Sequence, residues 1–130
     1  FVFDSVDNDV IGDYGRLGGA AGEEIDRADT ALGTPSHALV LATAQGFEGA
    51  MAKTKEEYLA ITPPDPADPA IRADMVFYET QNGGAVFSTG SIAWAGSLCH
   101  NHYDNDVSRI TRNVVMRFLN PEKFAIPISE

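Results

Sequence analysis

A tight turn between two strand-forming runs is the feature of the sequence that most restricts the fold. Residues 75–80 and 84–89 are rich in β-branched and aromatic side chains, and Gln81, Asn82 and Gly83 join them. An Asn-Gly pair is favoured where a short hairpin needs positive φ angles. The sequence therefore predicts an antiparallel β-hairpin over residues 75–89.

Two further elements follow from hydrophobic periodicity. Residues 37–43 form a continuous apolar run between Pro35 and Gly46, which is typical of a central strand buried on both faces of a sheet. Residues 105–119 carry apolar side chains at helical spacing, with Asp104 or Asn105 as the candidate N-cap. These patterns predict one central strand and one amphipathic C-terminal helix.

The remaining segments set the expected organisation. Residues 53–59 favour a short helix, in which Thr54 and Glu57 have the spacing of a capping box. Four prolines make residues 61–72 an exposed connector. Strand and helix patterns alternate, so we expect an α/β fold with a mixed, partly parallel sheet and one hairpin. The strand-like run at 1–3 leads us to expect that the chain is part of a longer polypeptide, with residues 1–130 as a single segment of a larger α/β domain.

Charge and cysteine content narrow the classes of partner. The formal net charge is −10, so the surface repels phosphate backbones and anionic lipid head groups. The single cysteine, Cys99, has no partner for an internal disulfide, and no apolar run reaches the ~20 residues of a membrane span. We expect no nucleic-acid partner, no membrane and a cytoplasmic location, with Cys99 as a buried structural residue.

Glu24 is the candidate general base. It follows several small residues, and a carboxylate buried beside small residues can be raised in pKa and accept a proton from water. The alternative is an acidic turn in which Asp26 and Arg27 form a solvated ion pair.

A second constellation lies just before the C-terminal helix. His100, His102 and Asp104 are close together in the sequence and could hold a metal ion. The other interpretation, which we favour, is that Asp104 and Asn105 cap the helix while the histidines lie at the surface.

Longer strings of residues carry a family resemblance. They are Ile11-Gly12-Asp13, Glu24-Ile25-Asp26-Arg27, Leu32-Gly33-Thr34-Pro35, the run from Gly83 to Leu98, and Val107-Ser108-Arg109-Ile110-Thr111. Together they resemble the C-terminal end of the N,N-dimethylformamidase large (beta) subunit family over nearly the whole chain. The sequence departs from relatives at His100 and His102, which flank Asn101, and at Asp106.

The resemblance implies a glutamine-amidotransferase-like layered domain in an enzyme that hydrolyses small N-substituted formamides to formate and an amine. It implies a mononuclear iron held by tyrosine and glutamate side chains upstream of this chain, so no metal ligand is assigned here. It also implies association with the remainder of the large subunit, a small subunit and a homo-oligomer. Through the match to the family motif the resemblance implies that Glu24 is the catalytic acid/base, and we expect Asp26, Arg27, His37 and Asn101 to contact the substrate or support the site. The alternative function is a non-catalytic module that completes the fold and contacts other subunits.

Overall fold

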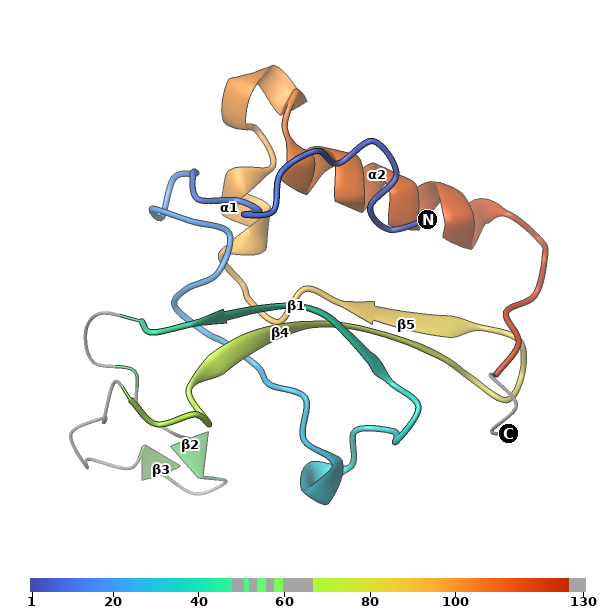
Figure 1. Cartoon of the computed structure of the whole chain (residues 1–130), viewed down its shortest axis with the longest axis horizontal. Coiled ribbons are helices and arrows are strands. Elements are labelled where there is room, and N and C mark those ends of the chain that lie inside the picture. Colours follow the sequence, from blue (N-terminus) through green and yellow to red (C-terminus); the bar gives the residue numbers. More distant parts are fainter. Residues whose placement is uncertain (48–50, 52–53, 56–57, 60–66, 127–130) are drawn as a thin grey trace.

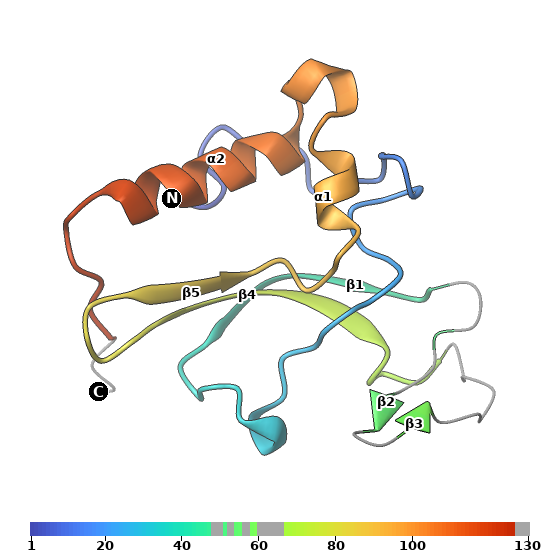
Figure 2. The same cartoon turned by 180° about the vertical axis from the view of Figure 1, so that it is seen from behind.

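A computed structural model describes residues 1–47, 51, 54–55, 58–59 and 67–126. Within these ranges an antiparallel three-stranded sheet, with strand order β1-β4-β5, is covered on one face by the helices α1 and α2 (Figures 1 and 2). The elements are η1 (Thr30–Leu32), β1 (Leu39–Gln45), β2 (Thr54–Lys55), β3 (Tyr58–Leu59), β4 (Arg72–Glu79), β5 (Ala85–Ser88), α1 (Trp94–Ser97), η2 (His100–Tyr103) and α2 (Asp106–Leu119). The architecture is therefore α/β, as predicted.

The predicted hairpin is confirmed as β4 and β5. The two strands pair antiparallel, with Phe77 opposite Phe87 and Glu79 opposite Ala85. Gly83 adopts φ +84°, which residues with a Cβ rarely adopt, and the Thr80 N–H donates to the Gly84 carbonyl at 2.8 Å. The Asn-Gly turn thus closes the hairpin at the predicted place.

The predicted central strand is an edge strand among the described residues. In the part of the chain that the structure describes, β1 pairs only with β4, in antiparallel register, and Leu39 and Val40 at its start are about half exposed. The central strand is β4, in which residues 73–77 are all buried. The predictions of a central strand at 37–43 and of a partly parallel sheet are therefore wrong. An apolar run shows that a segment can be buried, but it does not show which neighbours bury it.

The C-terminal helix is confirmed as α2. Asn105 is the N-cap, and its Oδ1 accepts the Ser108 N–H at 2.9 Å. The first residues of the chain lie along this helix, where the Asn113 amide donates to the carbonyls of Val2 and Asp4. The strand-like pattern at 1–3 is not borne out, because these residues enter a turn.

The core lies between the sheet and the two helices. Its buried residues are Val2, Ala20, Met75, Trp94, Val107, Ile110 and Val114. The Trp94 indole N–H donates to the Thr111 hydroxyl at 3.0 Å, which joins α1 to α2. The packing of α1 against α2 limits the path of residues 89–93, which join β5 to α1.

The 53–59 helix is not found at the residues that the structure describes there, because Thr54–Lys55 and Tyr58–Leu59 are paired strands. A helix of so few residues has little cooperative stability to oppose strand pairing. Residues 61–66 of the proline-rich connector lie outside the described residues, and β4 begins at Arg72, inside the range assigned to the connector.

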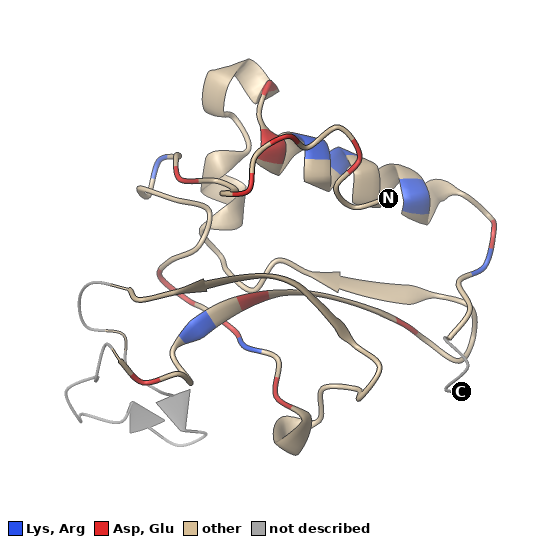
Figure 3. Ribbon diagram, in the orientation of Figure 1, with Lys and Arg blue, Asp and Glu red and all other residues tan. Residues whose placement is uncertain are grey.

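Charge is unevenly distributed over the described residues. Figure 3 shows basic residues along α2 and acidic residues in the N-terminal segment beside it. Of the helices that the structure describes, none combines the length and apolar character needed to span a bilayer.

Candidate functional site

Glu24 lies on a segment that runs beside the residues following β5. The Ile92 N–H donates to the Glu24 carbonyl at 3.2 Å, and the Asp26 N–H donates to the Gly90 carbonyl at 2.9 Å. Ile25 and Ser91 form an antiparallel bridge between these bonds. The backbone around Glu24 is therefore held as a short irregular strand.

Asp74 anchors the same segment from the central strand. Its N–H donates to the Asp26 carbonyl at 2.9 Å, and its Oδ2 accepts the Ala28 N–H at 2.8 Å. The side chain is 1% exposed and also accepts hydrogen bonds from Thr43 and Arg72. A charged residue within an apolar strand pattern is the only signal in the sequence that could have identified it.

Gly90 allows the chain to cross directly over Asp74. Its φ is +69°, and a Cβ placed there would lie 2.4 Å from the Asp74 carbonyl oxygen. Only glycine satisfies both the angle and the contact. The crossing brings residues 90–92 beside residues 24–26.

The side chain of Glu24 is exposed in this chain. The described residues of this chain therefore do not bury the carboxylate, because only the Glu24 backbone packs against residues 90–92. Whether Glu24 is catalytic is a separate question, and that role stays a prediction.

Arg27 pairs with Asp29 and not with Asp26. Its Nη2 lies 2.9 Å from Asp29 Oδ2, and Nε donates to the same oxygen at 3.2 Å. The Arg27 guanidinium, followed by the Ala31 N–H, holds the pKa of Asp29 below its ordinary value. The alternative of an Asp26–Arg27 pair is wrong, because the Arg27 guanidinium is bonded to the Asp29 carboxylate instead.

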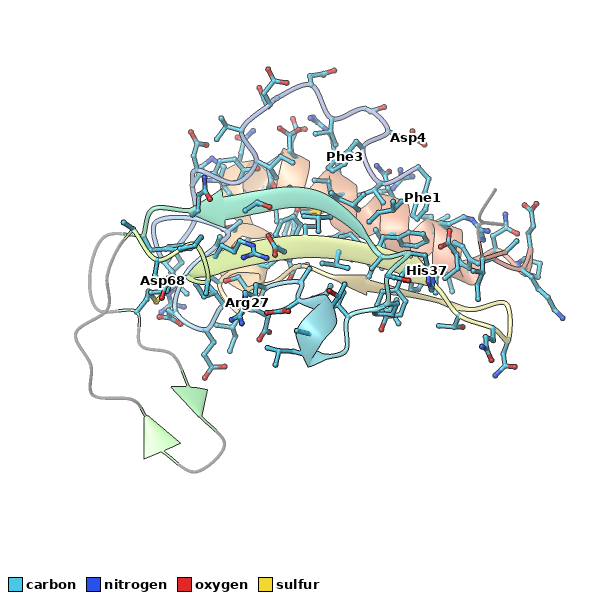
Figure 4. The ribbon with its side chains drawn as sticks, turned by 60° about the horizontal axis from the view of Figure 1, so that its bottom comes forward. Phe1, Phe3, Asp4, Arg27, His37 and Asp68 are labelled. Atoms are coloured by element: carbon cyan, nitrogen blue, oxygen red, sulfur yellow. The ribbon has the colours of Figure 1, made fainter. Side chains whose placement is uncertain are left out.

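His37 lies far from this segment along the sheet. Its Nε2 is 3.0 Å from the carbonyl oxygen of Glu79, the last residue of β4, whereas Arg72, the first, donates to the Ala28 carbonyl. These two ends of β4 are roughly 20 Å apart. Figure 4 shows Arg27 and His37 towards opposite ends of the sheet. The chain therefore does not bring His37 beside Glu24.

Asn101 lies in an exposed turn before α2. Asn101, His102 and Tyr103 have φ angles of 47°, 55° and 68°. Three consecutive residues other than glycine therefore have a left-handed backbone conformation. The Asn101 amide donates to the Asp104 carbonyl at 3.0 Å. In this chain its side chain is used to close the turn.

The residues considered for a metal site do not form a group of three ligands among the described residues, although His100 and Asp104 line the same pocket. His100 stacks on Tyr14 with ring centroids 4.2 Å apart, and Asp104 pairs with Arg109 at 2.6 Å. Within the part of the chain that the structure describes, no three His, Cys, Asp or Glu side chains are grouped so that they could hold a metal. Cys99, expected to be buried, is exposed.

A cavity of about 380 Å³ lies on the helical side of the sheet. Met75 and Trp94 line it together with several alanines, and Asp9 is its acidic residue. Glu24 does not line this cavity, so a water-poor environment for its carboxylate would have to come from atoms outside this segment.

Three matches to known proteins agree with one another. Residues 1–105 match the family model described as N,N-dimethylformamidase beta subunit-like, C-terminal. The chain is 42% identical over 134 residues to the N,N-dimethylformamidase beta subunit of Paracoccus aminophilus, with 94% of this chain and 16% of the relative covered. It is 42% identical over 123 residues to the protein of the same name from Alcaligenes sp, with 86% of this chain and 15% of the relative covered. The chain thus spans less than a fifth of the length of these relatives.

Proposed function

Because the chain belongs to the N,N-dimethylformamidase beta subunit-like, C-terminal family, we propose that it forms the C-terminal part of the large subunit of an amide hydrolase. The reaction we propose is cleavage of the C–N bond of small N-substituted formamides to formate and an amine. The observation that carries the proposal is the 42% identity to two proteins named N,N-dimethylformamidase beta subunit, over 94% and 86% of this chain.

In this proposal Glu24 is the general acid/base. Its carboxylate removes a proton from water as the water oxygen attacks the formyl carbon, and the same proton then passes to the departing nitrogen as the C–N bond breaks. Such a group must be held in place while its side chain stays free to reach the substrate. The backbone of Glu24 is fixed by Ile92, and the carboxylate makes no hydrogen bond within the described part of the chain.

The surroundings of Glu24 support a buried position in the whole protein. Ile92, whose N–H bonds the Glu24 carbonyl, leaves 57% of its surface exposed. Ile92 therefore offers an apolar side chain that another part of the protein can cover. We propose that the remainder of the large subunit covers it and excludes water from Glu24.

We propose that iron is the cofactor and that residues outside this segment hold it. The described residues contain no group of three or more His, Cys, Asp or Glu placed for a metal. The part that we propose for this chain is the proton transfer by Glu24. We also propose that the sheet and its helices complete a larger glutamine-amidotransferase-like domain in the cytoplasm.

The partner surfaces that we propose are apolar. On α2, Val115, Met116 and Leu119 are 51%, 55% and 72% exposed. We propose that this surface packs against the remainder of the large subunit, and that the assembled enzyme contains a small subunit and several copies of the large one. Both curated relatives are named beta subunit, which supports an assembly of more than one kind of chain.

Asp26 and Arg27 share the segment of Glu24 and are retained as candidates to contact the substrate. His37 and Asn101 lie elsewhere in this chain, and their part in the site stays a prediction.

The test is Glu24→Gln in the full-length protein, with formate release from N,N-dimethylformamide as the measurement. We expect kcat to fall by about 10²–10⁴, because the amide cannot accept the proton from water. The matched control is Glu122→Gln, an exposed glutamate near the C-terminal end of the described chain. It should leave turnover unchanged, and size-exclusion chromatography should show the same assembly for both variants. Full turnover by Glu24→Gln would refute the proposed role.

A further inference from the structure

One hydroxyl group lies at the centre of the bonds that hold the Glu24 segment. Ser91 Oγ accepts the N–H of Gly22 at 2.9 Å and that of Ala93 at 3.1 Å, and it donates to the Gly22 carbonyl at 2.8 Å. A serine hydroxyl has one donor and two acceptor positions, so all three are used. The hydroxyl is thus bonded to both backbone polar groups of a residue two positions before Glu24.

The residue between Gly22 and Glu24 is in an unfavourable conformation. Glu23 has φ +59°, in the left-handed region that costs a residue with a Cβ about 1–2 kcal/mol. Such a conformation persists when neighbouring bonds hold it. Here the bonds are the Ser91 hydroxyl on Gly22 before Glu23 and the Ile92 N–H on the Glu24 carbonyl after it.

We propose that Ser91 is a positioning residue for Glu24, whose hydroxyl fixes the backbone turn that aims the Glu24 carboxylate at the substrate. The proposal rests on the catalytic role proposed for Glu24. A role for Ser91 as a nucleophile does not fit, because its proton is donated to a backbone carbonyl and no described His or carboxylate accepts it.

The primary test is Ser91→Ala in the full-length protein. Without the hydroxyl, Gly22 loses both of its bonds to Ser91, and Glu23 can relax from its left-handed angle. A displacement of about 1 Å in a catalytic group can cost about 10²-fold in rate. We expect kcat for N,N-dimethylformamide to fall at least about tenfold while KM changes little, because the carboxylate is still present but misdirected.

The matched control is Ser108→Ala on α2. The Ser108 hydroxyl donates to the Leu98 carbonyl at 2.7 Å and has no bond to residues 22–24. It should leave kcat unchanged. Ser91→Cys keeps the size of the side chain but weakens its hydrogen bonds. It should give an intermediate kcat, and it serves as the test if Ser91→Ala does not fold.

A double-mutant cycle with Glu24→Gln separates positioning from general support of the fold. If Ser91 acts through Glu24, Ser91→Ala should have no further effect in the Glu24→Gln background. An equal loss in both backgrounds would overturn the proposal, as would full activity of Ser91→Ala and Ser91→Cys. In those outcomes Glu24→Gln alone would still be inactive, whereas an active Glu24→Gln would mean that the proposed function itself has failed.

Discussion

Asp74 is the residue on which the candidate site depends most. It is a buried carboxylate in the central strand, and its two oxygens accept hydrogen bonds from Thr43, Arg72 and the Ala28 N–H. Removing one member of such a group leaves the others without partners, which costs more than the bonds contributed. The order of the Glu24 segment therefore depends on a residue outside it.

We expect Asp74→Ala to lower the free energy of unfolding by about 3 kcal/mol, because Thr43, Arg72 and the Ala28 N–H lose their acceptor. Urea unfolding measures the loss. The control is Asp104→Ala, whose side chain is 72% exposed and pairs with Arg109 at the surface, and which should cost at most about 1 kcal/mol. Equal effects of the two variants would contradict the anchoring role of Asp74.

Asp29 gives a prediction about pH. Its pKa is lowered first by the hydrogen bond from Arg27 and then by the Ala31 N–H. A carboxylate with a lowered folded-state pKa contributes stability above its unfolded pKa, near 4, and loses it as pH falls through the folded value. Arg27→Gln should raise the Asp29 pKa towards its ordinary value, as followed by NMR of the carboxyl carbon. Because the Asp29 side chain is 29% exposed, the free energy of unfolding above pH 5 should differ little between Arg27→Gln and the unsubstituted protein.

At the scale of single elements, the structure confirms the predictions that depend on residues close together in the chain. The β4–β5 turn and the Asn105 cap follow from residues whose preferences are set by φ angles and nearby backbone N–H groups. The place of β1 at the edge of the sheet and the crossing of Gly90 over Asp74 depend on residues far apart in the chain. For the same reason Glu24 could be selected from the sequence, whereas the roles of Ser91 and Asp74 around it could not.

The crossing can be tested by comparing two glycines with similar angles. Gly90 and Gly18 have φ of +69° and +87°, but only at Gly90 would a Cβ meet backbone, whereas at Gly18 it would meet nothing within 4 Å. Both substitutions to Ala should cost about 1–2 kcal/mol for the left-handed angle. Gly90→Ala should cost at least about 1 kcal/mol more, because the central strand must move. Equal thermal unfolding of the two variants would show that the crossing tolerates a methyl group.

At the scale of the whole molecule, the described part is two layers with a small core and much exposed apolar surface. The core cluster is confined to one side of the sheet, while α2 leaves Val115, Met116 and Leu119 at its outer surface. A composition typical of a folded protein predicts a core but not how much of that core is completed by other polypeptide. The edge position of β1 and the exposure of Glu24 have the same explanation under the proposed function, since both would be covered in the large subunit.

This coverage can be tested by placing a charge on the outer surface of α2 in the full-length protein. If the remainder of the large subunit packs on Val115, then Val115→Lys buries an unpaired ammonium group and should lower Tm by several degrees. Leu32→Lys is the control, since Leu32 is 75% exposed on the short helix η1, which lies on the opposite side of the sheet from α2. A surface lysine away from any partner changes stability by at most about 0.5 kcal/mol. A Tm unchanged in both variants would mean that α2 faces solvent in the whole protein, and the proposed packing surface would then have to lie elsewhere on this chain.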